Sequence, residues 1–396
     1  MSLSSDLVSA LDAAVDACAP ELDALARELH AHPELRFEEH HAAAAIAGLL
    51  ERHGHEVERG LADMPTSFRA RAGQEGGGPR IAILAEYDAL PEIGHACGHN
   101  LIAAGAVGAF LAAARVVGRA GGTVELLGTP AEEGGGGKIK LIDAGAFAGV
   151  DAAIMYHPFD RDLLVHPTLA SAWLRFAFRG TPSHAAIAPH EGKSALTACM
   201  DTFRLIDGQR VHFRDGVRVH GYILDGGQAV NIVPETSSCE ISVRAATSAE
   251  LERVKAVVVR CARAAAMASD VPFEVDERRG YAELVNNRAL ARVFGEHLAR
   301  VGRAPKWEDS TIGAGSTDMG DVSHVVPSIH PWVAICGEGE TTCHQRAFAA
   351  AAASDRGLCA AREAAKSLAA TALEFLGSSD LRAAVRSEFD RAPRRG

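Results

Sequence analysis

Two kinds of hydrophobic pattern divide the chain. Up to about residue 160, short continuous apolar runs such as residues 81–85 alternate with segments whose apolar positions recur every three or four residues. Continuous apolar runs are typical of strands buried in a parallel sheet, and the longer period is typical of amphipathic helices. Their alternation predicts an α/β fold, with a mostly parallel sheet flanked by helices.

The same pattern predicts where these elements lie. An amphipathic helix is expected over residues 5–31, where Pro20 marks a break or a new helix start, and an alanine-rich helix over 39–52, which ends before Gly54. The expected strands are 66–72, 81–85, 123–127 and 151–156, and the expected helices between them are 101–117 and 138–144.

A different pattern begins after about residue 168. Residues 173–178 (WLRFAF) alternate between apolar and polar, as in a strand with one exposed face. Alternating strands are also expected over 217–224 and 236–244, with helices over 194–205 and 248–267. This predicts an inserted α+β two-layer sandwich at 170–282, between a catalytic domain's first part (1–169) and second part (283–396).

The second part of the catalytic domain resumes the α/β pattern. A helix over residues 288–301 is followed by a Gly/Ser/Asp loop over 313–321. A strand near 329–335, a long alanine-rich helix over about 347–376 and a short terminal helix from Asp380 complete the prediction.

Composition and charge narrow the class of protein. The chain has 396 residues and a formal net charge of -11, which argues against non-specific binding of nucleic acid. The N-terminus lacks the basic and apolar regions of a signal peptide, and no apolar run reaches the ~18 residues of a membrane span. Eight scattered cysteines show no disulfide spacing. We therefore expect a cytoplasmic protein with neither nucleic-acid nor membrane partners.

Side chains that bind metals follow the C-terminal end of four predicted strands. They are Asp88, Cys97 and His99 after 81–85, Glu132 and Glu133 after 123–127, His157 after 151–156, and Cys343 and His344 after 329–335. The carboxyl ends of parallel strands meet at one edge of a sheet, where binding sites form. Imidazole, thiolate and carboxylate together suit zinc, manganese or a related first-row ion.

The adjacent carboxylates Glu132 and Glu133 are expected to have different roles. Two neighbouring carboxylates repel each other unless a cation lies close by. One would bind the metal and the other would act as a base for water. Taken singly, such a pair is usually a solvated helix start, a histidine is usually a satisfied structural residue, and Cys97 would be a core side chain. Their joint position at four strand ends favours a metal site.

Several motifs make the chain resemble a known family. It is similar to the amidohydrolase branch of the aminoacylase, glutamate carboxypeptidase and auxin-conjugate hydrolase superfamily, the two-metal peptidases of clan MH. The motifs are HAHPELRFEEHHAA (30–43), AEYDALPEIGHACGHN (85–100), TPAEEGGGG (129–137), MYHP (155–158) and CHQRAF (343–348). STDMGDVSHVVPSIHPW (316–332) resembles a narrower group, the β-alanyl-lysine-type dipeptidases and p-aminobenzoyl-glutamate hydrolases.

The resemblance implies roles for individual residues. Two divalent ions, zinc or manganese, would be bound by Cys97, His99, Glu133, His157 and His344. Glu132 would be the general base, and Asp88 would orient a metal ligand from behind. Glu86 stands where the branch commonly has aspartate and is a weaker ligand candidate. Many members carry Glu-Asp-Phe where this chain has Ser316 to Met319, which favours the dipeptidase-like group.

The inserted segment carries two further motifs, GTPSHAA (180–186) and GGQAVNIVP (226–234), which match the family's lid and dimerisation domain. The resemblance implies that His184 stabilises the oxyanion and that Asn231 contacts substrate, and some members place both in the neighbouring subunit's site. Arg244 could clamp a substrate carboxylate, although a solvated arginine at the end of a strand is the alternative. A homodimer through this domain is expected.

These expectations define a metal-dependent hydrolase that cleaves the amide bond of a small dipeptide or an N-acyl or aminoacyl amino acid. The alternatives are a deacylase of simple N-acetyl amino acids, an aryl-glutamate amidohydrolase and, from another class, a non-catalytic binding protein of the same fold. A binding protein would have lost ligands or the base, and none of the candidates is missing.

Overall fold

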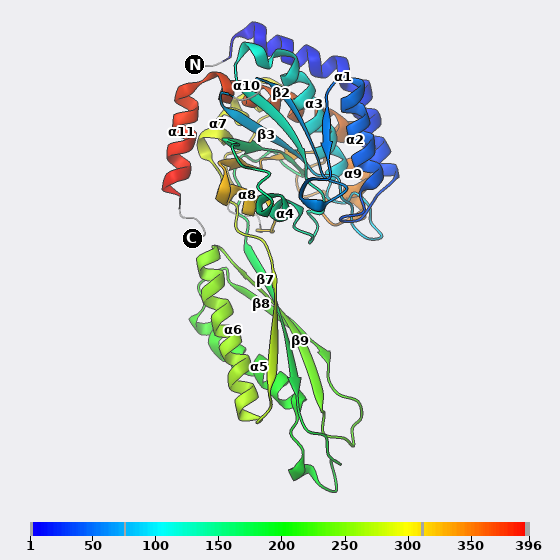
Figure 1. Ribbon diagram of the computed structural model, residues 1–396, viewed down its shortest axis with the longest axis vertical. Helices are drawn as coiled ribbons and strands as arrows, with labels where there is room; N and C mark the ends of the chain where they lie inside the picture. The colour runs from blue at the N-terminus through cyan, green and yellow to red at the C-terminus, as the bar shows by residue number, and fades with distance from the viewer. Residues whose placement is uncertain (1–2, 75–76, 310–312, 393–396) are drawn as a thin grey trace.

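The computed structural model describes residues 3–74, 77–309 and 313–392. It has an α/β part and an elongated antiparallel part that extends away from it (Figure 1). The α/β part contains a six-stranded sheet of order β1-β2-β4-β3-β5-β11. Its strands are β1 (Val57–Arg59), β2 (Phe68–Gly73), β3 (Arg80–Ala85), β4 (Thr123–Gly128), β5 (Ala152–Ile154) and β11 (Ser328–Ile329). The last four are parallel, which confirms the predicted fold class.

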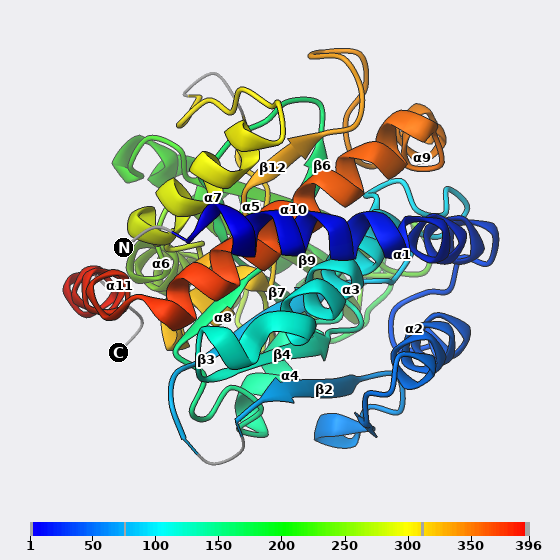
Figure 2. The same ribbon diagram turned by 90° about the horizontal axis from the view of Figure 1, so that it is seen from above.

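Helices cover both faces of this sheet, and this explains the continuous apolar run of β3. Ile81 and Ile83 point into one core, and Ala82 and Leu84 into a second core on the opposite face. The first face is covered by α1 (Ser5–Ala31), α3 (His99–Val116) and α10 (Asp355–Gly377), which pack side by side (Figure 2). The other helices of this part are α2 (His40–Arg52), α4 (Gly137–Asp143), α7 (Arg288–Arg300), α8 (Met319–Val325), α9 (Arg346–Ala352) and α11 (Ser379–Arg391).

Helix α3 runs through the centre of the first core. By length and composition the segment His99–Arg119 is apolar enough to cross a membrane, which the sequence reading overlooked, but 78% of its apolar window is buried inside the protein. A Cβ at Gly105 would lie 2.5 Å from the ring of Tyr156. The small residues of α3 therefore serve close packing.

The antiparallel part is a four-stranded sheet of order β10-β7-β9-β8 with two helices on one face. Its elements are β7 (Ala170–Arg179), α5 (Ala195–Gln209), β8 (Arg218–Asp225), β9 (Thr236–Ala245), α6 (Ser248–Ala268) and β10 (Phe273–Arg279). They form the predicted two-layer sandwich, which we call the lid. The exact domain boundaries at 169/170 and 282/283 remain a prediction.

The structure corrects the predicted end of the chain in three places. The strand expected over 329–335 is two strands, because β11 pairs with β5, whereas β12 (Trp332–Ala334) pairs with β6 (His157–Phe159) in a separate two-stranded sheet. Pro331, which lacks an N–H donor, lies between them. The long helix is divided into α9 and α10, since Ser354 caps α10 by accepting a hydrogen bond from Gly357 N.

The third difference is α8, which begins at Met319, inside the segment that the sequence predicts to be a loop.

A fourth difference concerns the N-terminus. Pro20 does not interrupt α1, because apolar residues on both sides of it are buried against the rest of the core. This burial outweighs the ~3 kcal/mol that an interior proline costs a helix.

Candidate active site

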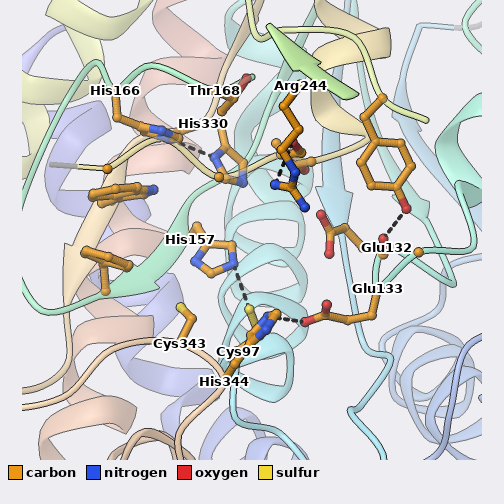
Figure 3. Close-up of a pocket in the computed structure, with 18 of the residues that line it drawn as sticks. Cys97, Glu132, Glu133, His157, His166, Thr168, Arg244, His330, Cys343 and His344 are labelled. Carbon is orange, nitrogen blue, oxygen red and sulfur yellow. Dashed lines mark hydrogen bonds and ion pairs between the residues drawn. The ribbon is translucent and has the colours of Figure 1, made fainter. Parts of the chain in front are cut away.

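A cavity of about 520 Å³ lies where the α/β part meets the lid (Figure 3). Cys97 and Glu132 reach it from loops beyond the C-terminal ends of β3 and β4, and His157 reaches it from the start of β6, just beyond β5, as the strand-end pattern predicts. His344 enters from the segment before α9, and Arg244 from the end of lid strand β9. The cavity therefore brings together segments that lie far apart in the sequence.

The loop after β3 supplies two closely placed donors. Gly98 has a φ of +77°, and a Cβ there would lie 2.9 Å from Pro158, so only glycine suits this turn. The turn places Cys97 in the cavity and makes His99 the first residue of α3. Cys97 Sγ lies 3.7 Å from His157 Nε2. Donor atoms of Cys97, His99 and Glu133 lie within 4.8 Å of one another.

Asp88 orients the neighbouring groups from behind. Its carboxylate accepts hydrogen bonds from His99 Nδ1 (2.9 Å) and from the backbone N of Glu133 (2.8 Å). The carbonyl oxygen of Asp88 also lies 3.0 Å from His99 Nδ1, so this nitrogen carries a proton, and the lone pair of Nε2 is the one that can bind a metal ion. Burial favours a raised pKa for Asp88, but His99 and the backbone N of Glu133 outweigh it, and the pKa lies below the ordinary value.

Buried polar atoms without partners test whether a metal fits here. Among the described residues, His99 Nε2, Glu86 Oε2 and Glu133 Oε1 are buried without a hydrogen-bond partner. Glu133 Oε1 lies 3.3 Å from His344 Nε2, within the range of an ion pair. Unpaired buried polar groups are costly unless an ion satisfies them. The donors present, imidazole, thiol and carboxylate, fit a divalent transition metal.

Glu132 and Glu133 have opposite electrostatic settings. Burial raises the pKa of Glu132 well above its ordinary value, and the negative charges of Glu133 and Glu86 raise it further. Burial acts on Glu133 in the same direction, but the bond to His344 and the charge of His99 outweigh it and lower its pKa. One carboxylate thus favours the protonated form and the other the ionised form. Such separation is typical of an acid–base group next to a ligand.

A buried lysine that the sequence reading missed lies behind the site. Lys138 Nζ donates to Glu86 Oε1 (2.5 Å) and to Asp318 Oδ1 (2.7 Å), and all three side chains are fully buried. Burial disfavours the charged lysine, but the two carboxylates outweigh it and raise its pKa. Glu86 is thereby held beside His99 Nε2, at 3.5 Å. No local pattern distinguished Lys138 from a solvated residue at a helix start.

An aromatic wall, also missed, lines the cavity opposite the carboxylates. Trp332 stacks on Phe159, with ring centroids 3.8 Å apart, and on His166 at 4.2 Å. His166 Nε2 lies 3.1 Å from His330 Nδ1. Burial lowers the pKa of His166 to about 4, so it is neutral at pH 7. His330 directly follows β11, so the strand-end rule that selected His157 could have selected it as well.

The lid contributes Arg244 and Trp173 to the cavity. Arg244 Nη1 donates to Ser316 Oγ at 3.5 Å, a long hydrogen bond that links lid and α/β part. Ser316 itself donates to the carbonyl of Leu169 at 2.8 Å. The remaining N–H groups of the Arg244 guanidinium therefore face the cavity, which Glu132 also enters (Figure 3).

His184 and Asn231, in contrast, lie outside this cavity within the chain. They flank the far end of the lid sheet, one full length of β7 from Arg244, which at 3.3 Å per residue is roughly 30 Å. The two segments pair with each other, since Ala185 N donates to Asn231 O at 2.9 Å. Both side chains are exposed. The structure therefore brings His184 and Asn231 together, but not with the other predicted site residues.

Comparison with known proteins agrees with this geometry. Residues 82–369 match peptidase family M20/M25/M40. The chain belongs to this family. It is 36% identical over 390 residues to a mouse (Mus musculus) Xaa-Arg dipeptidase, covering 95% of this chain and 90% of that protein. It is 32% identical over 323 residues to a p-aminobenzoyl-glutamate hydrolase polypeptide of Escherichia coli, covering 76% of this chain and 66% of that one.

The fold agrees with a solved M20 peptidase as well. A dinuclear metal-binding peptidase from Bacillus subtilis superposes with a TM-score of 0.71 at 22% identity, covering 91% of this chain and 99% of that one. Family membership and fold together make this M20 protein a metal-dependent hydrolase of amide bonds.

Proposed function

We propose that this M20 protein cleaves the amide bond of a small dipeptide or an N-acyl or aminoacyl amino acid, with Glu132 as the general base. The observation that carries the proposal is the position of Glu132. Its carboxylate lies in the cavity beside the donor cluster, while the hydroxyl of Tyr281 donates to its backbone oxygen at 2.6 Å. The relatives named as a dipeptidase and an aminobenzoyl-glutamate hydrolase support the substrate class.

Two divalent ions, zinc or manganese, complete this proposal. Cys97, His99, Glu133, His157 and His344 are the proposed ligands. The ions supply Lewis acidity, which polarises the amide carbonyl and activates water. Asp88 keeps His99 in the required tautomer, and Lys138 binds one oxygen of Glu86 and leaves the other, Oε2, beside His99 Nε2.

Glu132 moves the protons in the proposed reaction. The residue accepts a proton from the attacking water and transfers it to the nitrogen of the leaving amine. Its burial and its negative neighbours raise its affinity for the proton that it accepts, and a divalent ion bound close by would keep the resting carboxylate ionised. Arg244 binds the carboxylate of the substrate and sets which side of the amide faces Glu132.

A specific observation favours one second candidate, an aryl-glutamate amidohydrolase. Phe159, whose ring stacks on the buried Trp332, and Trp173 from the lid both line the cavity, where an aromatic acyl group would contact them. An aminoacyl group would make less use of this wall. A deacylase of simple N-acetyl amino acids would use it least.

A substrate screen separates these candidates. The purified protein, stripped of metal and reloaded with zinc or manganese, is assayed with aminoacyl dipeptides, p-aminobenzoyl-glutamate and N-acetyl amino acids. We expect the highest kcat/KM with dipeptides. Preference for the aryl-glutamate would select the second candidate, and no hydrolysis of any amide with either metal would contradict the proposed function.

We also propose a homodimer through the lid. The edge strand β8 leaves its backbone groups unpaired on one side, and Tyr222, Ile223 and Leu224 along it are exposed. A partner there would bring His184 and Asn231 toward the other subunit's cavity, where His184 would stabilise the oxyanion and Asn231 would contact substrate. Sedimentation as a monomer with full activity would contradict this.

We propose a cytoplasmic location on the basis of the thiols. All eight cysteines, each within the described residues, are free, and six of them are buried. Free thiols persist in a reducing compartment. Fractionation of cells that express the tagged protein would test this, and recovery outside the cytoplasm would contradict it.

A further inference from the structure

Cys343 follows a predicted strand end but is not among the ligands that the family resemblance implies, and it lies at the cavity. One ring nitrogen of His157 and the sulfur atoms of Cys97 and Cys343 all lie within 4.8 Å of one another. Cys343 is next to Cys97 and below His157 in the close-up (Figure 3). It is only partly buried: it packs against the edge of the first core and also lines the cavity.

The backbone holds Cys343 in this position. His344 N donates to Ala96 O at 2.8 Å, which ties the segment to the loop that carries Cys97. His344 has a φ of +68°, a left-handed conformation that is uncommon for a residue with a side chain. This bend lets two consecutive residues, Cys343 and His344, both line the cavity. Gln345 stabilises the bend by accepting a hydrogen bond from Thr341 Oγ1 at 3.0 Å.

Three overlapping donor sets meet at this site. The first is Glu86, His99 and His157, and the other two share Cys97. One set is Cys97, His99 and Glu133, which combines sulfur, nitrogen and oxygen. The other is Cys97, His157 and Cys343, which combines two sulfurs and one nitrogen. Two cysteines, one histidine and an open position form a donor set of catalytic zinc sites. Soft sulfur donors favour zinc, whereas manganese prefers oxygen.

We infer that Cys343 is a further metal ligand, and that it makes the half of the centre formed by Cys97, His157 and Cys343 selective for zinc over manganese. The inference rests on the proposed two-metal function and names a ligand beyond it. On binding, a metal–sulfur bond forms and the thiol proton passes to solvent. The other half, with its carboxylate, keeps the mixed character that either ion accepts.

Cobalt(II) provides the test, because it replaces zinc and its bonds to thiolates absorb in the near ultraviolet. The reduced, metal-free protein is titrated with cobalt as wild type, Cys343→Ser, Cys97→Ser and Cys359→Ser. We expect Cys343→Ser to lose between about a third and a half of the thiolate band, since one of two sulfur ligands is removed. Cys359, an exposed thiol away from the cavity, is the matched control and should leave the band unchanged.

Two results would overturn the inference: a full thiolate band in Cys343→Ser, or equal loss of zinc and manganese affinity in that variant. We expect its zinc affinity to fall on the order of tenfold more than its manganese affinity. If the variants fold poorly, X-ray absorption of the zinc-loaded wild type counts the sulfur ligands directly, and a count of one sulfur per subunit would overturn the inference. Amide hydrolysis by the wild type tests the proposed function separately. If Cys343→Ser keeps the full thiolate band and the wild type still hydrolyses amides, only the proposed role of Cys343 is removed.

Discussion

We call the donor cluster and the buried side chains behind it the floor of the cavity. The floor and the far end of the lid both carry residues that the family resemblance singles out, but the two regions differ in burial and in contacts. On the floor, Asp88 and Lys138 are buried and each contacts an oppositely charged or polar partner. At the far end of the lid, His184 and Asn231 are exposed, and their segments contact mainly each other. The donors of the floor all come from one chain, whereas the lid end lies apart from them within that chain.

The largest expected effect tests the floor. Glu132→Gln removes the group that accepts and returns the proton, so kcat should fall by roughly 10²- to 10⁴-fold. Metal content, measured by elemental analysis, should stay at the wild-type value, because the proposed ligand is Glu133. Wild-type-like turnover in this variant would remove Glu132 from the mechanism.

The second prediction tests whether the lid end acts across a dimer. Glu132→Gln and His184→Ala subunits are expressed together with different tags, and the mixed dimer is purified. If His184 acts on the partner's site, the mixed dimer keeps one intact site and about half of the wild-type activity. Activity no higher than that of the two parent dimers would show that His184 does not act in this way.

The third prediction concerns how the free energy of unfolding depends on pH through Glu39, a buried carboxylate that contacts the segment carrying Glu132. Glu39 is fully buried and accepts a hydrogen bond from the backbone N of Ala131 (2.8 Å), the residue before Glu132. Burial, aided by Asp88, raises its pKa from 4.5 to about 7. Between these pH values the folded protein binds more protons than the unfolded chain, so the free energy of unfolding falls as pH rises, by roughly 3 kcal/mol.

Glu39→Gln tests this, because the amide resembles the protonated acid and does not titrate. Thermal or urea unfolding from pH 4.5 to 7 should show a steeper loss of stability in wild type than in the variant. Parallel pH profiles for the two proteins would mean that Glu39 ionises normally.

The smallest expected effect tests the junction between the two regions. Arg244→Lys keeps the charge but loses the paired donors, so KM for an acidic substrate should rise by about 10- to 100-fold, equivalent to a charged hydrogen bond. The carboxamide form of the same substrate is the control, and its KM should hardly change. An equal rise for both substrates would exclude recognition of a carboxylate by Arg244.

Much of this architecture could be predicted from local pattern. The run over residues 81–85 is apolar at every position because β3 is covered on both faces, and residues 173–178 alternate because the lid has helices on one face only. Cys97, Glu133 and His157 were placed at one edge because parallel strands end together. The division of the final strand and helix was missed, although Pro331 and Ser354 were visible signals.

The sequence by itself determined the α/β class, the inserted sandwich and the cluster of candidate ligands at the strand ends, because these depend on periodicity and on side chains next to strand termini. Only the tertiary structure decided that Lys138 lies between Glu86 and Asp318, which are 52 and 180 residues away from it. The tertiary structure also shows that His184 lies outside the cavity of its own chain. The physical reason is that a buried charge is stable only beside its partner, and distant segments supply that partner.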